Sequence, residues 1–409
     1  MVVCTGRGLT ESRRAIGAIG QVDPCVVVGG AMIACPVTGA TKHRFALPRR
    51  IASDAVDEVL AHGFPALVFK DPGESAYDYL VVTGAERHAL DPVTEWWFGE
   101  MGLRVRRVTT LDEDDHPEHT VRVLREDSFK GVDIVLSSPG SKVSAQFSPI
   151  AAKDGAVVVD NTSHFRMDPL IPLVIPEVNR HDIGMFKNKG IIANPNCSTI
   201  QMLVALKPLH DVARIRRIVV STYQAVSGAG QAGITELETQ VRDLFNMREV
   251  TQTLFPKRMA FNVIPCVPQK DAFNPDGNTT EEQKMIDETK KIMGDPSIKV
   301  SATCVRVPVF NGHSESVNIE LERPLSAEAA RELLRKAPGV ALLDDPKTML
   351  FPTPLDASGE DLVLVGRIRE DPTVQYGLNL FVVGDNLRKG AALNAVQIAE
   401  ELIKHHLGN

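Results

Sequence analysis

The chain has 409 residues, enough for two or three domains, and 43% of them are hydrophobic. Its 52 acidic residues outnumber its 45 basic residues, and the net charge of −7 argues against a surface that binds nucleic acid. The longest uncharged apolar stretch, Cys25 to Val37, is too short to cross a bilayer, and the first residues lack the apolar core of a signal peptide. We therefore expect no membrane segment and a cytoplasmic location.

The first part of the chain, residues 1 to about 122, alternates short strands with one clear helix, which is typical of an α/β arrangement. The charged run Asp112–Glu118 then predicts a junction. The histidines of Asp114–His119 lie in this run, and we interpret them as part of a solvated linker and not as a metal site. The predicted elements are the strands Val2–Cys4, Cys25–Val28, Ala66–Phe69, Tyr79–Val82 and Leu103–Val108, and the helix Ile51–His62.

From Ser128 onward the pattern predicts half of a doubly wound sheet, followed by longer strands and helices. The first group consists of strand Val132–Leu136, helix Ser144–Lys153, and strands Ala156–Asp160 and Gly190–Ala193. The second consists of strands Ile218–Gln224, Lys299–Val309 and Ser316–Leu321, helices Gly233–Phe245 and Glu281–Met293, and one long helix at Leu387–Leu407.

Two of these helices carry apolar stripes at helical spacing. The first stripe predicts a core contact or a subunit interface, and the second an apolar face on the last helix. The stripes are Ile234, Leu237, Val241, Leu244 and Phe245, and Ala391, Ala395, Ile398, Leu402 and Ile403.

The six cysteines form no C-x-x-C pair, so neither a zinc site nor a disulfide framework is predicted. Cys197 differs from the others because it lies between a strand and an apolar helical run that ends near Pro208. Asn194 and Asn196 suit a turn and a helix cap, which would put the thiol at a helix N-terminus where the helix dipole favours thiolate. The alternative interpretation is a buried structural cysteine.

Two later segments supply further polar candidates. Ser221–Gly230 (STYQAVSGAG) predicts a strand that enters a loop of small residues, where backbone can approach a ligand. In Cys304–Ser316 (CVRVPVFNGHSES), Arg306 lies in a strand and His313 follows its turn. An arginine there can bind a carboxylate and a histidine can transfer protons, although a lone arginine or histidine beside a strand is more often structural.

Together these segments resemble aspartate-semialdehyde dehydrogenase from about Asp127 to the C-terminus. Seven segments match in family order: Val157–Met167 (VVVDNTSHFRM), Val174–Asn179 (VIPEVN), Asn194–Thr199 (NPNCST), Tyr223–Gly230 (YQAVSGAG), Glu281–Lys284 (EEQK), Arg306–Ser316 (RVPVFNGHSES) and Asp385–Asn394 (DNLRKGAALN).

The resemblance implies NADPH-dependent reduction of L-aspartyl phosphate to the semialdehyde in amino-acid biosynthesis, with release of phosphate. It implies that Cys197 is the nucleophile, that His313 is the acid/base and that Gln224 orients the thioacyl group. By the same resemblance, substrate is held by Arg306, Arg166, Lys284, Glu281 and Asn196. The nicotinamide half of NADP(H) would contact Ser227, Gly228 and Asn386, and no metal is implied.

The glycine-rich G-x-x-G-x-x-G turn of this family has no counterpart ahead of Asp127. The nearest candidate, Val2–Glu11, has Glu11 in place of the third glycine. We therefore expect weak cofactor binding and marginal folding.

Residues 1 to about 122 resemble instead a fragment of a haloacid-dehalogenase-like (Cof-type) phosphatase, with Thr5 in its phosphate-binding motif and an αβ cap. The aspartates of that family are absent. A phosphatase, or a catalytically dead fusion that acts only as a dimerising protein, are the alternative functions. A genuine fusion, a truncation or an assembly artefact would each produce such a join.

The expected fold is α/β: an incomplete Rossmann-like nucleotide domain and an α+β catalytic domain, preceded by the phosphatase-cap-like segment. The expected boundaries are 1–122 for the phosphatase fragment, 123–196 with the C-terminal helix 386–409 for the NADP-binding domain, and 197–385 for the catalytic and dimerisation domain. The family resemblance implies a homodimer or homotetramer.

Overall fold

A computed structural model describes residues 25–27, 32–34, 41–44, 49–62, 64–69, 79–85, 88–90, 92, 95, 98, 103–110 and 124–407. The chain divides into two compact units, Met1–Val123 and Leu124–Asn409. Three predicted features lie outside the described residues: the strand Val2–Cys4, the segment Val2–Glu11 with Thr5, and the histidines of Asp114–His119.

The first unit contains two small sheets and a helix. Strands β1, β2 and β3 form an antiparallel sheet, and β5 pairs antiparallel with β4 and parallel with β6. Val56 of the helix α2 packs with Leu80 and Val82 of β5. The predicted strands and helix are confirmed here to within about two residues. The bounds are β1 Cys25–Val27, β2 Met32–Ala34, β3 Thr41–Arg44, α2 Arg49–Ala61, β4 Ala66–Phe69, β5 Tyr79–Val82 and β6 Val105–Val108.

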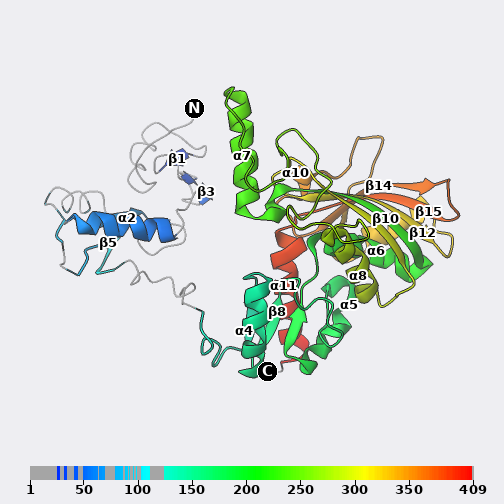
Figure 1. Ribbon diagram of the computed structural model, residues 1–409, viewed down its shortest axis with the longest axis horizontal. Coiled ribbons are helices and arrows are strands. Elements are labelled where there is room, and N and C mark those ends of the chain that lie inside the picture. The colour runs from blue at the N-terminus through cyan, green and yellow to red at the C-terminus, as the bar shows by residue number, and fades with distance from the viewer. Residues whose placement is uncertain are drawn as a thin grey trace. The chain divides into compact units, whose positions relative to one another are not determined.

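The second unit begins with a three-stranded parallel sheet in the order β7-β8-β9. The middle strand, β8, is buried on both faces: Val158 packs with Ala151 of α4, and Val157 and Val159 pack with Ile398 of α11. Figure 1 shows α4 and α11 on either side of β8. This confirms half of a doubly wound sheet. The bounds are β7 Ile134–Ser137, α4 Ser141–Lys153, β8 Val157–Asp160, β9 Ile191–Ala193 and α11 Leu393–His405.

A mixed six-stranded sheet follows, in the order β11-β10-β12-β15-β14-β13 (Figure 1). Strands β10 and β11 run parallel, as do β13 and β14, and the other neighbours are antiparallel. Helices α6, α8 and α9 contribute to the hydrophobic core of this sheet. The bounds are α6 Cys197–Ala213, β10 Ile215–Gln224, α8 Thr280–Met293, β11 Lys299–Arg306, β12 His313–Leu321, α9 Ala327–Arg335, β13 Val340–Leu342, β14 Val363–Asp371 and β15 Gly377–Gly384.

Shorter elements complete the second unit. They are α5 (Pro176–Asn179), the 3₁₀ helices η3 (Arg180–Asn188) and η4 (Val226–Ala229), α7 (Gln231–Phe245), α10 (Pro354–Ala357) and the π-helix η5 (Arg388–Ala392). Within the described ranges, no helix combines the length and the apolar character that a membrane span requires.

Helix α6 corrects one prediction, because it continues through Pro208 to Ala213. A proline inside a helix removes one backbone hydrogen bond. In α6 the last turn is stabilised by burial, since Leu209 and Ala213 lie in the same core as Leu203 and Leu206.

The C-terminal segment corrects the prediction of one long helix at Leu387–Leu407, because it is not one uniform helix. The π-helix η5 precedes α11, and the wider turn rotates the residues that follow it. Ala395, Ile398 and Leu402 are buried as predicted, whereas 57% of Ile403 is exposed.

The stripe on α7 is confirmed as a core contact for four of its residues, because Ile234, Leu237, Val241 and Leu244 belong to one hydrophobic cluster. Phe245, the last residue of the stripe, is 76% exposed and lies edge-on to Phe261.

Candidate active site

Cys197 is the first residue of α6, where the sequence predicts it. The cap is Asn196, whose side-chain oxygen accepts hydrogen bonds from the backbone N–H groups of Ser198 (3.0 Å) and Thr199 (3.2 Å). Burial, the larger cause, and the charge of Glu281 raise the pKa of the Cys197 thiol to about 12, although Arg306 and Arg166 oppose the rise. This shift runs against the predicted preference for thiolate, because burial disfavours the charged form.

The π-helix η5 reaches the thiol from the C-terminal part of the chain. A Cβ added to Gly390 would lie 2.9 Å from the Cβ of Cys197. Only a residue without a side chain fits this approach. This contact has no signal in the local sequence, and we did not predict it.

Gln224 and Arg306 lie side by side at the ends of two parallel strands, because they are partners in the register of β10 and β11. Arg306 is buried, and its Nη1 donates to the carbonyl oxygen of Ala225 (2.8 Å). Its Nε has no hydrogen-bond partner among the described residues. Gln224 is also buried, and its Nε2 donates to Ser198 Oγ (3.2 Å) on the helix that carries the thiol.

His313 faces the same strand ends and is fully buried. Its Nδ1 accepts a hydrogen bond from the backbone N–H of Ala225 (3.0 Å). Burial and the nearby charge of Arg306 lower its pKa to about 3, so the ring is neutral at neutral pH. Since Nδ1 is the acceptor, the proton of the neutral ring is on Nε2, which has no hydrogen-bond partner in the described part of the chain.

Arg306 and His313 both pack directly against Gly228. A Cβ on this glycine would lie 2.8 Å from Arg306 Nη1 and 3.1 Å from His313 Nε2. A second contact ties His313 to α6, because Gln201 Nε2 donates to the His313 carbonyl oxygen (3.2 Å). Gln201 is one turn beyond Cys197, so the thiol, guanidinium and imidazole belong to one site.

Glu281 connects three of the predicted residues. Its Oε1 accepts from Asn196 Nδ2 (2.7 Å) and Gln224 Nε2 (3.5 Å), and its Oε2 pairs with Lys284 Nζ (3.1 Å). Burial opposes ionisation of this carboxyl, but Lys284, Asn196 and Arg306 together lower its pKa. Glu281 is therefore a carboxylate that positions Lys284 and the cap of α6.

Arg166 is held in place by α8. Its Nη1 pairs with Glu288 Oε1 (3.0 Å), and its Nη2 donates to the carbonyl oxygen of Asn161 (3.0 Å). Glu288 is missing from the predicted set. The available signal was helical spacing, since Glu281, Lys284 and Glu288 share one face of α8.

The predicted cofactor residues also come together. Asn386 Nδ2 donates to Ser227 Oγ (2.9 Å), and Asn386 Oδ1 accepts from the backbone N–H of Gly312 (3.0 Å). Gly228 follows Ser227 in η4. Ser227 and Asn386 therefore lie next to the glycine that packs against Arg306 and His313.

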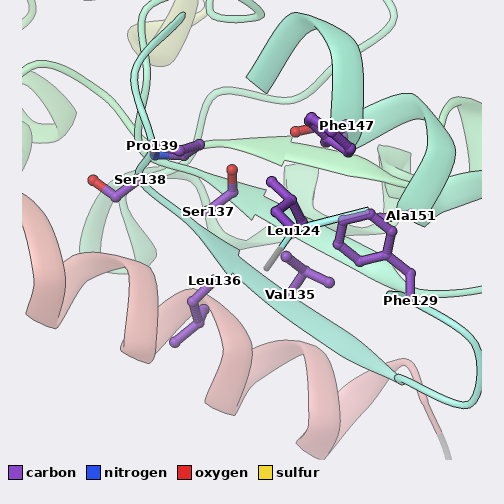
Figure 2. A pocket seen from close by; sticks show the side chains of 10 residues that line it. Leu124, Phe129, Val135, Leu136, Ser137, Ser138, Pro139, Phe147 and Ala151 are labelled. Atoms are coloured by element: carbon purple, nitrogen blue, oxygen red, sulfur yellow. The ribbon is translucent and has the colours of Figure 1, made fainter. Parts of the chain in front are cut away.

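A separate pocket of about 340 Å³ lies between β7 and α4 (Figure 2). Its lining is mostly apolar and contains none of the predicted site residues. The lining residues are Leu124, Phe129, Val135, Leu136, Ser137, Ser138, Pro139, Phe147, Ser148 and Ala151.

Comparison with known proteins identifies the family. The NAD binding domain of semialdehyde dehydrogenases matches residues 100–186, ahead of the predicted start near Asp127, and the dimerisation domain matches residues 206–389. The aspartate-semialdehyde dehydrogenase of Aquifex aeolicus (strain VF5) is 56% identical over 292 residues, which cover 71% of this chain and 85% of that protein. The chain belongs to the aspartate-semialdehyde dehydrogenase family.

Solved structures of aspartate-semialdehyde dehydrogenases agree with this assignment. Enzyme II from Vibrio cholerae, in complex with ASA, has 50% sequence identity and a TM-score of 0.66 over 75% of this chain and 85% of that one. The Candida albicans enzyme with NADP has 28% identity and a TM-score of 0.53 over 66% of this chain and 77% of that one. The expected α/β fold with a nucleotide-binding and a dimerisation part is thereby confirmed.

Proposed function

We propose that the chain catalyses the NADPH-dependent reductive dephosphorylation of L-aspartyl 4-phosphate to L-aspartate 4-semialdehyde. The observation that carries this proposal is the convergence of Arg306 Nη1 and His313 Nε2 on Gly228, at 2.8 and 3.1 Å from a built Cβ. The thiol of Cys197 lies within the electrostatic influence of the same arginine. A cation and a hydrogen-bond donor beside a thiol suit an anionic acyl substrate.

Cys197 would act as the nucleophile. Its sulfur attacks the acyl carbon, the carbon–oxygen bond to phosphate breaks, and the thiol proton leaves with the phosphate as hydrogen phosphate. The product is a thioacyl enzyme. NADPH, when bound, supplies the hydride that reduces the thioacyl carbon. The carbon–sulfur bond then breaks, the sulfur takes up a proton from the medium, and the semialdehyde is released.

His313 would act as the acid of the site through Nε2. Because Nδ1 accepts from Ala225, the Nε2–H group is the one that can donate to the substrate carbonyl oxygen. Such a donor stabilises the negative charge that develops on this oxygen in each tetrahedral species. Gln224 would orient the thioacyl group from the neighbouring strand end.

Substrate would be held at both ends. Arg306, with its free Nε, would bind the α-carboxylate, and Arg166, Lys284 and Asn196 would bind the phosphate. Glu281 would position Lys284 through their ion pair at 3.1 Å. Fixing both ends presents the carbonyl carbon to the sulfur.

The cofactor would be NADP(H), with its nicotinamide half against Ser227, Gly228 and Asn386. The fit is supported by the hydrogen bond from Asn386 Nδ2 to Ser227 Oγ (2.9 Å), which brings these polar groups together next to Gly228. The turn Ser137–Ser141, between β7 and α4, lies at the carboxyl end of a parallel strand, where dinucleotides bind in such folds.

We also propose that the protein is cytoplasmic and forms a homodimer through residues 197–385. The alternative is a homotetramer, and the mass of the assembly in analytical ultracentrifugation distinguishes the two. Residues 123–196 and 386–409 would form the NADP-binding domain. Residues 1–122 would be the segment that resembles a Cof-type phosphatase, although the match to the NAD binding domain begins at residue 100.

The test is the reverse reaction. Purified protein is incubated with L-aspartate 4-semialdehyde, inorganic phosphate and NADP⁺, and NADPH is followed by its near-ultraviolet absorbance. We expect NADPH to form only when phosphate is present, and C197S to abolish it. Absence of phosphate-dependent NADPH with the native chain would overturn the proposal.

A further inference from the structure

We infer that Glu288 is a positioning residue that fixes the phosphate-binding side of the site relative to the segment that carries the thiol. The inference rests on the roles proposed above for Arg166 and Cys197. It concerns a residue that touches neither substrate nor cofactor in that proposal.

The two carboxylate oxygens of Glu288 serve two different segments. Oε1 accepts from Arg166 Nη1 (3.0 Å), and Oε2 accepts from the backbone N–H of Asn196 (2.7 Å). Asn196 directly precedes Cys197. The Glu288 side chain is only 1% exposed, so water does not replace either contact. A single buried carboxylate therefore links the guanidinium to the turn that presents the sulfur.

The rest of the α8 face strengthens this link. Lys291, at the next helical step, donates to the carbonyl oxygens of Arg166 (2.7 Å), Asp168 (2.7 Å) and Ile171 (2.8 Å). At the other end of the face, Glu281 holds the side chain of Asn196. Helix α8 thus forms hydrogen bonds with backbone and side-chain groups of both the Arg166 segment and the Asn196 segment. Glu288 is the residue that contacts both segments at once.

The geometry leaves Arg166 free to bind an anion. Glu288 and the Asn161 carbonyl each take one N–H group, one on Nη1 and the other on Nη2. A guanidinium has five N–H groups, so three are left. One of these is on Nε, which is buried and has no hydrogen-bond partner among the described residues. Two fixed contacts prevent rotation of the group and keep the other donors in one orientation.

The variant E288Q tests the inference, because glutamine has one acceptor oxygen where glutamate has two. It can satisfy Arg166 or Asn196, and its amide N–H group then faces the other donor. The readout is alkylation of Cys197 by iodoacetamide, quantified by mass spectrometry of the Cys197 peptide, with inorganic phosphate as the protecting ligand. We expect the phosphate concentration for half-protection to rise about tenfold, as for the loss of one charged hydrogen bond.

The matched control is D287N, which removes a neighbouring carboxylate charge from the same helix. Asp287 accepts from Gln283 Nε2 (2.9 Å), and among the described residues it forms no hydrogen bond with Arg166 or Asn196. We expect native protection by phosphate. An equal loss in D287N and E288Q would mean that any charge change on α8 has this effect, and would overturn the inference.

A double-mutant cycle separates positioning from a general structural role. If Glu288 acts by linking Arg166 to the Asn196 segment, E288Q has a smaller effect on phosphate protection once R166Q is present. Additive effects would overturn the inference. If E288Q does not fold, E288D carries the same test, since it keeps the charge but shortens the reach. Native protection in E288D would then overturn the inference. These outcomes need no turnover, so they are distinct from a failure of the proposed reaction.

Discussion

Gly390 approaches Cys197 so closely that a Cβ on the glycine would lie 2.9 Å from the Cβ of the cysteine. The π-helix η5 makes this approach possible, and it brings the C-terminal segment against Cys197. The Asp385 carbonyl oxygen lies 3.5 Å from the same point, at an ordinary van der Waals distance, so the close contact is the one with Cys197.

We predict that G390A reduces turnover about 100-fold, because the added methyl group displaces the sulfur from its attack position. Steady-state rates of the reverse reaction measure the effect, and circular dichroism reports whether the fold is retained. G184A is the control, since its Cβ would meet His406 at 3.4 Å, an ordinary contact, and no atom of Cys197 is among its neighbours within 4 Å. Native turnover in G390A would show that the close approach has no catalytic consequence.

The second prediction concerns the ionisation of Cys197 in the free protein. Its pKa is about 12, against an ordinary value of 9.0. Because only the thiolate reacts, alkylation by iodoacetamide will rise about tenfold per pH unit between about pH 8 and pH 10.5. Rates are taken from the Cys197 peptide, to separate them from Cys266. A plateau within this range would mean that the thiol ionises at an ordinary or lowered pKa.

The third prediction uses two charges of opposite sign beside the same thiol. Glu281 raises the Cys197 pKa and Arg306 lowers it. E281Q should therefore speed alkylation at fixed pH, and R306Q should slow it, each by about three- to tenfold, for a shift of about half to one pH unit. Each variant is the control for the other, because a general loosening of the site would speed alkylation in both.

The fourth prediction concerns stability. Lys389 is fully buried, and its Nζ donates to Glu177 Oε2 (2.6 Å), Asn394 Oδ1 (2.9 Å) and Gln397 Oε1 (2.6 Å). K389M leaves a largely buried carboxylate without its partner, and we expect the free energy of unfolding to fall by about 3–5 kcal/mol. Chemical denaturation of the purified chain measures this value.

The control for K389M is K189M. Lys189 pairs with Asp168 at 2.7 Å, but the two side chains are 42% and 26% exposed. Loss of such an ion pair should cost only about 0–1 kcal/mol. If both variants lose the same stability, burial is not what makes the Lys389 contacts important.

Much of the fold follows from local patterns. The strands around β8 and the cap at Asn196 have short-range signals, in apolar runs and in the asparagine and proline before Cys197. Two features have no such short-range signal: the continuation of α6 beyond Pro208 and the π-helix at Arg388–Ala392. Packing against residues distant in sequence determines both.

The site shows the same division. The residue types at Cys197, Arg306 and His313 indicate the chemistry, but the protonation of the thiol depends on burial and on the charge of Glu281. Glu288 escaped prediction because its partners, Arg166 and Asn196, are remote in sequence. Only the tertiary structure brings a helix face against both.

One continuous core has a mechanical consequence. Val158 of the three-stranded sheet, Leu203 of α6 and Val317 of the six-stranded sheet belong to the same hydrophobic cluster. Close-packed interiors transmit displacement and resist shear. We therefore expect the nucleotide-binding and catalytic halves to move and melt together, so that ligands are admitted by rearrangement of surface loops and not by a hinge between halves.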